Sequence, residues 1–467
     1  MNRFLALGVF SVLVAPAVSL AANYEEKNER PDAPLAAAAA AAKDMPIGAG
    51  FKASLGGSAQ HRYQSFDNLV NYFAGTADAA SSSGHSHDLS LFARERVNLE
   101  IHHDCGLRFF LEAQDAREFS HGRPASPVAT ENFLDLYQGY LDFGFRPDIV
   151  DKPTLQFRVG RQELELGNGH FFSAQDWNNT GQNFDLARAD WRPDGFELTT
   201  FAGWPLDAAR RKFDVPSGET IAGANLKAVG IPFGHIVEGR LLYKWDERTT
   251  VAGERGTTGP ERRWTLGSQA RGHFLTTWDY TLDASYQTGS SGGSNIRAWN
   301  AYGEAGWTYR FKWRSLRVAA QYSQSSGDRN PADGTVQTFD PLFADQYLFH
   351  GKLLIAGDRN LEDFNPKAQA RLWRGGLIQL DYHLFRLNQA RDALYRAYED
   401  TVRHDPTGRA GQDAGQEIDL QIFHNFNDNL SLGGGMFLFD PGSLFGESEG
   451  PRVHPARSFF IMLKTSF

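Results

Sequence analysis

Arginine side chains recur on the polar face of segments in which polar and apolar residues alternate. A planar, permanently charged guanidinium group binds carboxylate or phosphate through two parallel hydrogen bonds. A ring of such groups favours anion selectivity, whereas an arginine opposite a carboxylate only neutralises and stiffens a wall. Both interpretations stay open for each candidate. The candidates are Arg94, Arg96, Arg108, Arg158, Arg188, Arg271, Arg310, Arg317 and Arg371, with Glu112, Asp142, Glu304, Asp381, Glu417 and Asp419.

Arg161 departs from this alternation. In the stretch FRVGRQELELGNGHFF (157–172), continued alternation would place Arg161 among apolar residues, on the face opposite to Arg158. Gly160 is a position where a β-bulge costs little, and a bulge would turn Arg161 and Glu163 to the side of Arg158. Without a bulge, both residues must lie at a rim. We include Arg161 among the candidates in either case.

Glu95 is a second exception, because it shares a parity with Val97, Leu99 and Ile101. A period of two would place this carboxylate on the apolar face of its strand. A local bulge or a rim position is the only explanation that the pattern offers.

Other motifs are weak. His102-His103-Asp104-Cys105 has a metal-like composition, but it lies in an expected tight turn where adjacent side chains diverge. Residues 289–293 match G-x-S-x-G without the helix that a nucleophile elbow requires. No set of Ser, His and Asp is placed convincingly for hydrolysis. We therefore expect no metal site, no cofactor and no enzymatic activity.

The alternating segments run roughly 9 to 13 residues, and crossing a bilayer at a tilt takes about 9 to 11, against about 5 to 6 for most strands of globular proteins. The pattern predicts about 18 strands. They lie near 51–64, 88–103, 106–118, 133–146, 154–163, 184–192, 195–203, 221–230, 236–247, 262–273, 277–288, 297–311, 314–325, 367–374, 376–387, 415–426, 429–440 and 457–467.

The links between these segments alternate between short and long. Lys312-Trp313 and Asn427-Asp428 are short, whereas 164–183 and 326–366 are long. This alternation is typical of an antiparallel up-and-down β-barrel in an outer membrane, with short periplasmic turns and long extracellular loops. The apolar parity would then face lipid and the polar parity a lumen wide enough for an aqueous channel. The last segment, ARSFFIMLKTSF, is similar to the C-terminal strand of bacterial outer-membrane proteins.

Composition excludes several classes. The chain has 467 residues, 41% hydrophobic and 13% aromatic, with a mean hydropathy of -0.44. No apolar run of helix-spanning length follows the N-terminus, so a helical membrane protein is excluded. The net charge of -9 lacks the concentrated basic excess of a nucleic-acid binder. With one cysteine, Cys105, no internal disulfide can form.

The sequence divides into three expected regions. Residues 1–21 have the charged start, apolar core and small-residue end of a signal peptide. Residues 22–50 are low in complexity and are expected to form a flexible periplasmic leader. Residues 51–467 then form the barrel, a multi-pass protein in the lipid of a bacterial outer membrane. We expect it to be a monomer.

Several segments resemble the alginate-export family of outer-membrane porins. They are RVGRQELELGNG, NFDLARADW, GFELTTFAGW, NLEDFNPKAQARLW, DYHLFRL, AGQEIDLQIFHNF and LGGGMFLFDPG. The resemblance implies an 18-stranded barrel that carries an anionic uronate polysaccharide outward through an arginine-lined constriction. It also implies roles in the solute path for Arg158 and Arg161 and for the acidic pair Glu417 and Asp419.

Two transport functions stay open. The first is a passive export channel for an acidic polysaccharide, with residues 326–366 as a candidate plug or gate and periplasmic export or gating proteins as partners. The second is a general or uptake porin for small anions or sugars, which the same barrel would serve. Arginines clustered at one height would favour the first, and an open lumen of mixed charge would favour the second.

Overall fold

The computed structural model describes residues 43–72, 87–121, 130–145, 154–208, 213–397, 401–446 and 453–467. The expected signal peptide, 1–21, lies outside the described residues, as does most of the expected leader, 22–50. The last residues of that leader form strand β1 (Met45–Gly48), which pairs with β2 in antiparallel orientation.

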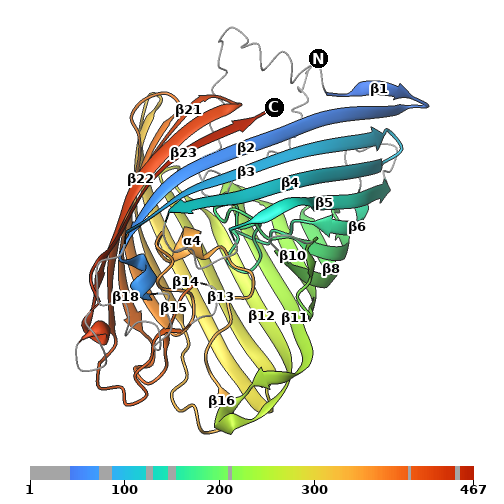
Figure 1. Ribbon diagram of the computed structural model, residues 1–467. Coiled ribbons are helices and arrows are strands. Elements are labelled where there is room, and N and C mark those ends of the chain that lie inside the picture. The colour runs from blue at the N-terminus through green and yellow to red at the C-terminus, as the bar shows by residue number, and fades with distance from the viewer. Residues whose placement is uncertain are drawn as a thin grey trace.

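Eighteen antiparallel strands close into one barrel, as the sequence predicts (Figure 1). Each strand pairs with the next along the chain, and the last strand pairs with the first and closes the sheet. The strands are β2 (Phe51–Asp67), β3 (His87–His103), β4 (Leu107–His121), β5 (Asn132–Phe145), β6 (Leu155–Gln162), β7 (Phe184–Trp191), β8 (Phe196–Asp207), β10 (Glu219–Ile231), β11 (His235–Ala252), β12 (Thr258–Phe274), β13 (Trp278–Ser291), β14 (Ser294–Phe311), β15 (Arg314–Ser325), β17 (Leu361–Arg371), β18 (Gly376–Leu387), β21 (Asp413–Asn427), β22 (Leu430–Pro441) and β23 (Ala456–Ser466).

The remaining elements are short. They are the strands β9 (Val215–Pro216), β16 (Thr335–Val336), β19 (Leu394–Tyr395) and β20 (Thr401–Arg403), the helix α4 (Gln346–Phe349), and the 3-10 turns η1 (Leu69–Tyr72), η2 (Pro232–Gly234), η3 (Glu254–Gly256) and η4 (Ser443–Phe445). Among the described residues, no helix has the length and apolar character needed to cross a membrane.

The two ends of the barrel differ, and we call them the short-turn rim and the long-loop rim. The strict alternation of link lengths was wrong in two places. At the long-loop rim, β11 and β12 are joined by residues 253–257, and β13 and β14 by Gly292-Gly293. Strands β11 to β14 have 18, 17, 14 and 18 residues, so they absorb sequence that we assigned to loops. This part of the wall extends beyond the rest in Figure 1.

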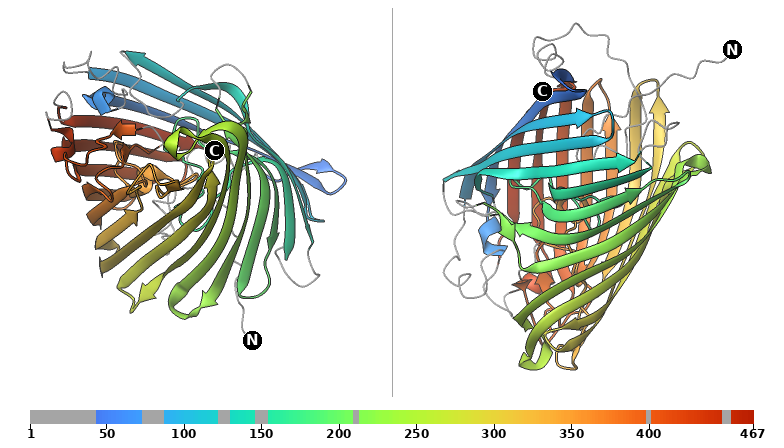
Figure 2. Two further views of the ribbon diagram at one scale, coloured as in Figure 1. Left: turned by 90° about the horizontal axis from the view of Figure 1, so that it is seen from below. Right: turned by 90° about the vertical axis from the view of Figure 1, so that its right-hand side faces the viewer.

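Side chains alternate between the two faces of the wall. On β12, Trp264 and Leu266 are exposed on the outside, while Arg263, Thr265 and Gln269 are buried on the inside. This is the reverse of a soluble protein, and it fits a barrel with an apolar outer band and a polar interior. Viewed from the long-loop rim, the ring of tilted strands encloses further segments of chain (Figure 2, left).

Two side chains are exceptions on the wall, because Glu95 keeps its parity although it is charged, and Tyr137 leaves its parity. Glu95 faces outward, and because the pairing of β2 with β3 is uninterrupted, neither a bulge nor a rim position explains it. Its Oε1 lies 2.7 Å from Nε2 of His61, so an ionisable partner accompanies it on the outer face. Tyr137 points inward because the register of β4 and β5 shifts between Gln138 and Leu136. The inward-turned ring of Tyr137 stacks on the guanidinium group of Arg96, on β3.

The strand register also distinguishes the two placements considered for Arg161, which are an inward turn through a bulge and a position at a rim. The pairing of β6 with both neighbours is continuous, so Gly160 carries no bulge. Gly160 instead has φ of 130°, and a Cβ atom there would overlap the carbonyl oxygen of Gly139. Glycine is therefore required by the close approach of β5 and β6. Arg161 keeps the outward parity and lies at the long-loop end of β6.

Candidate functional site

Two segments fold into the lumen and cross it. The first inner segment, residues 163–183, links β6 to β7, and the second, residues 326–360, links β15 to β17 and includes α4 (Figures 1 and 2). The first contacts β3 through Asp176 and β12 through Asn168, whose Oδ1 accepts a 2.7 Å hydrogen bond. The second contacts β11 through Asp340 and β21 through the backbone N–H of Lys352. The candidate plug thus lies among inward-facing side chains of distant strands.

The two inner segments also bind each other. The N–H of Phe343 donates to the carbonyl of Phe171 at 3.0 Å, and the N–H of Ser173 donates to the carbonyl of Phe343 at 3.2 Å. Further along, the rings of Trp177 and Tyr347 stack with centroids 4.0 Å apart. Because main chain and side chains both take part, the two segments pack into one unit inside the lumen.

The arginines on the inner wall are mostly paired with carboxylates. Arg158 contacts Asp142 through two hydrogen bonds of 2.6 and 2.9 Å. Arg108 shares Asp142 and also contacts Glu100 at 2.6 Å. On β7, Arg188 pairs with a carboxylate two residues along its own strand. These pairs compensate the positive charge locally and stiffen the wall.

Other predicted arginines contact the first inner segment or lie near the short-turn rim. Arg94 binds Asp176 at 2.6 Å, and Arg96 contacts Glu163 at 3.4 Å. Arg271 pairs with an acidic residue of β11, at 3.3 Å. Close to the short-turn rim, Arg310 donates to the carbonyl of Thr276. The side chain of Arg371 has no ion pair or hydrogen bond with any described residue.

Arg161 is separated from Arg158 by the wall itself. Its guanidinium group binds Asp185 of β7 at 3.0 Å and donates to the carbonyls of Leu136 and Asp214. The structure therefore ties Arg161 to neighbouring strands at the long-loop end, and it does not bring the two arginines of the GRQ segment together.

Glu417 and Asp419 lie fully buried on the inner face of β21. Glu417 accepts hydrogen bonds from the N–H groups of Lys352 and Leu353 at 2.6 and 2.9 Å, and Asp419 accepts from Lys352 at 3.2 Å. These three hydrogen bonds fix the main chain of the second inner segment at Lys352 and Leu353. This acidic pair therefore anchors the second inner segment to the wall.

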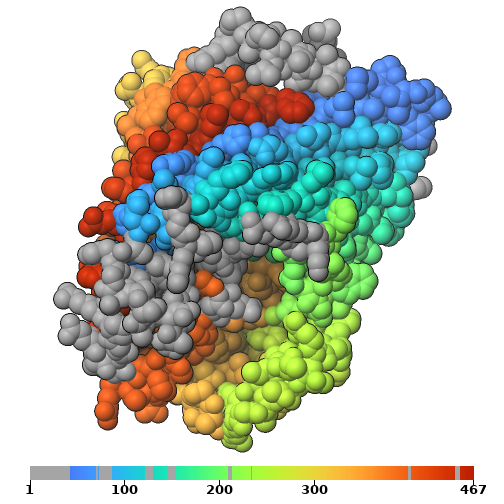
Figure 3. Space-filling view, viewed as in Figure 1, coloured from blue at the N-terminus to red at the C-terminus, as the bar shows by residue number. Residues whose placement is uncertain are grey.

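Where the inner segments meet the wall, Arg62 and Lys352 lack a carboxylate at ion-pair distance within the described part of the chain. Arg62 of β2 donates to the carbonyl of Trp177 at 2.7 Å and stacks 4.0 Å above its ring. Lys352 of the second inner segment lies over the ring of Tyr347. Both line a cavity of about 30 Å³, together with Gln64, Asn178, Asn179 and Phe92. The cavity lies where both inner segments meet the wall. Elsewhere on this face, the surface is hollowed beside the green strands, where yellow and orange residues lie deeper (Figure 3).

Arg62 was not among the residues predicted from the sequence. The residue stands in SAQHRYQS, where the polar parity holds Gln60 and Gln64, so it shares its strand face with amides rather than acids. The parity rule alone would have placed it inside the barrel. Its distinguishing feature, the lack of a carboxylate partner, arises from the three-dimensional neighbourhood and has no signal in the sequence.

The docking of the second inner segment is expected to depend on pH through Asp345. Burial raises the pKa of this carboxyl to about 7, although Lys352 opposes the shift. Because the docked carboxyl prefers the proton, docking is strongest below about pH 4 and weakens as the pH rises through 7. We expect single channels in planar bilayers to spend more time open at pH 8 than at pH 5.

The variant Asp345→Asn should flatten this dependence, because the amide stays neutral. Asp333→Asn, an exposed position on the same segment, should leave the wild-type pH profile unchanged. An unaltered profile in Asp345→Asn would assign the pH dependence to other groups.

Comparisons with known proteins agree with the barrel architecture. The model of a family described as alginate export matches residues 51–458. Pseudomonas aeruginosa OpdL has a TM-score of 0.55 and 12% identity, with 89% of this chain and 98% of that chain covered. P. aeruginosa OpdK, solved with vanillate, has a TM-score of 0.56 and 8% identity, with 88% and 98% covered. At these identities the likeness shows a shared fold alone. A search of curated proteins found no match.

Proposed function

Because the chain belongs to the alginate export family, we propose that it is a channel that passes an anionic polysaccharide of the uronate type. The family and the closed 18-strand barrel support a multi-pass location in the outer membrane, so the fold, family and location predicted from the sequence are confirmed. The uronate solute and a role for arginines along its path are the parts that we propose here. The channel would act by passage alone, without covalent chemistry.

The observation that carries this proposal is the pair Arg62 and Lys352. A uronate polymer presents one carboxylate on each sugar, and a solute can use only those lumen cations that no wall carboxylate already occupies. Arg62 offers a guanidinium fork to such a carboxylate. The ring of Trp177 and the amides of Asn178 and Asn179 line the same cavity and would contact a sugar ring and its hydroxyl groups.

The cavity must widen before a sugar can pass. A volume of about 30 Å³ holds roughly one or two water molecules, far less than a sugar ring. Lys352 and Leu353, which line the cavity, belong to the second inner segment, and removal of that segment would enlarge the cavity from one side. We therefore propose that passage requires displacement of the second inner segment, by the polymer or by a periplasmic partner.

A general or uptake porin for small anions or sugars is the second candidate. It is favoured by the wall, where Arg158, Arg108 and Arg188 are compensated by carboxylates. Such a lumen of mixed charge needs no polymer, and a small solute could pass between the inner segments after a smaller movement. The two candidates differ in how they respond to a long polyanion.

The test is ion selectivity and block by oligomannuronate in planar bilayers, with Arg62→Gln and Lys352→Gln compared with the wild type. We expect anion selectivity in the wild type and a concentration-dependent block by the oligomer. Each substitution should weaken the block about tenfold, the effect of losing one charged hydrogen bond of about 1.5 kcal/mol.

Arg158→Gln is the matched control, because this arginine is already paired with Asp142. It should change the block less than Arg62→Gln does. A pore indifferent to oligomannuronate but permeable to single sugars or small anions would support the general porin instead.

A further inference from the structure

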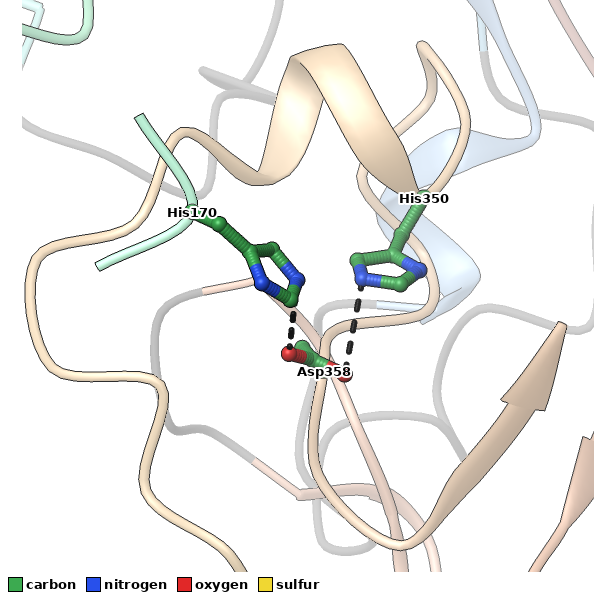
Figure 4. Close-up of side chains that lie close together, drawn as sticks. All are labelled: His170, His350 and Asp358. Atoms are coloured by element: carbon green, nitrogen blue, oxygen red, sulfur yellow. Dashed lines mark ion pairs between the residues drawn. The ribbon is translucent and has the colours of Figure 1, made fainter. Parts of the chain in front are cut away.

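His170, His350 and Asp358 form a compact cluster where the two inner segments meet. His170 comes from the first inner segment, and the other two residues come from the second. All three side chains are buried, and they point toward one another (Figure 4). Their ligand atoms lie within 4.8 Å of one another. From this geometry we infer a binding site for a divalent transition-metal ion of the zinc type, which joins the two segments.

The distances fit two ligands of one ion better than hydrogen bonds. Nε2 of His170 lies 3.4 Å from Oδ2 of Asp358, and Nε2 of His350 lies 3.5 Å from Oδ1. Zinc binds nitrogen and oxygen at about 2.0–2.2 Å, so two ligands at tetrahedral positions lie roughly 3.3–3.5 Å apart. The ligand atoms of the two histidines lie within 4.8 Å of each other, so they must approach by up to about 1.4 Å to reach the spacing of tetrahedral ligands.

The nitrogen atoms that face the site have no other partner. Neither Nε2 atom makes a hydrogen bond, although both imidazole rings are about 99% buried. A buried nitrogen without a partner is costly, and most such atoms in native structures are satisfied. A metal ion between the three side chains would satisfy both atoms at once.

The surroundings resemble the outer shell of a metal site. Nδ1 of His350 lies 3.2 Å from Oδ2 of Asp363, and a carboxylate at this far nitrogen fixes the tautomer and directs the Nε2 lone pair toward a metal. Nδ1 of His170 lies 3.9 Å from Oδ1 of Asp283, which is beyond hydrogen-bond distance. Asp358 is in turn held by the amide of Asn300, which donates to it at 3.0 Å.

The donor set selects the class of ion. Two imidazoles with one carboxylate suit zinc, copper or nickel, whereas calcium and magnesium prefer oxygen ligands alone. Such an ion would cross-link residues that are 180 positions apart in the sequence, His170 and His350. If the proposed channel function holds, the cross-link would keep the inner segments docked and reduce the current. The binding itself does not depend on that function.

The test uses the full-length protein in detergent, stripped with a chelator and titrated with Zn²⁺ by calorimetry. We expect one ion per chain and a higher thermal midpoint in zinc, and no such response to Mg²⁺. His350→Gln and Asp358→Asn should abolish the binding, whereas His61→Gln, an outward-facing histidine, should retain it. Asp363→Asn should weaken the affinity roughly 10- to 100-fold, the usual effect of losing an outer-shell partner.

A second measurement avoids variants that could release the inner segments. Co²⁺ added to the wild-type protein should give the visible absorption of a low-symmetry nitrogen and oxygen site, and Zn²⁺ should remove it. Absence of this signal, or equal zinc binding in His350→Gln, would overturn the proposal and leave the cluster as an ion-pair network. Zinc binding without any change of current would retain the site and count instead against displacement of the second inner segment as the step that opens the channel.

Discussion

A barrel in which residues 342–357 are replaced by Gly-Ser-Gly is expected to conduct several times more current than the intact protein. These residues include α4 and the backbone that Glu417 anchors, so their removal opens the lumen where the second inner segment lies. The ends of the excised piece lie close together, because Nη2 of Arg359 contacts Oδ1 of Asp340 at 3.1 Å. A short linker can therefore close the chain without pulling on the wall.

The barrel should tolerate this excision, since residues 342–357 contain none of the strands of the hydrogen-bonded sheet. The measurement is single-channel conductance in planar bilayers at high salt, with resistance of the folded barrel to unfolding in detergent as the control for folding. Because Lys352 is removed with the segment, block by oligomannuronate should weaken while the current rises. An unchanged conductance in a folded barrel would show that other segments limit the current.

The barrel was predictable because its signal is strictly local. On β13, Leu282, Ala284 and Tyr286 alternate with polar neighbours in the sequence, and they alternate with them in exposure in the structure. Such a pattern fixes both the existence of a strand and its lipid-facing side. The ends of strands are less certain, because β12 includes Gly259 and Pro260, and Gly259 pairs with Val251, where propensity alone would end the strand.

The interior was less predictable, because its contacts join residues far apart in the chain. Parity alone gives an inward arginine no partner, so Arg62 and Arg158 look alike in the sequence, although only Arg158 faces a carboxylate. The cluster of His170, His350 and Asp358 has no motif, since the fold of two long links creates it. Tyr137 is a third case, because a register shift in its own strand reversed its face. These features depend on tertiary pairing, which a period of two does not contain.

The second large effect is expected for Asp340→Ala, which should lower the free energy of unfolding by about 3 kcal/mol. Asp340 anchors the second inner segment to β11 and β12, where it lies 2.6 Å from Lys244 and 3.4 Å from Arg263. Arg359 contacts its other oxygen. Removal leaves three buried or half-buried cations short of an anion, and breaking a buried pair from one side typically costs about 3–5 kcal/mol. We expect the lower end of this range because Glu261 still contacts Lys244 and Arg263.

Urea titration of the protein in lipid vesicles at pH 7 measures this loss, and proteolysis of the second inner segment reports whether the segment is released. Burial alone would raise the pKa of Asp340, but Lys244, Arg359 and Arg263 hold it below the usual range, so the full effect is present at neutral pH. Asp333→Ala, at an exposed position of the same segment, should change the stability by less than about 0.5 kcal/mol. Equal losses in both variants would mean that the cations near Asp340 find other partners, and that the wall, rather than this carboxylate, determines how the inner segment docks.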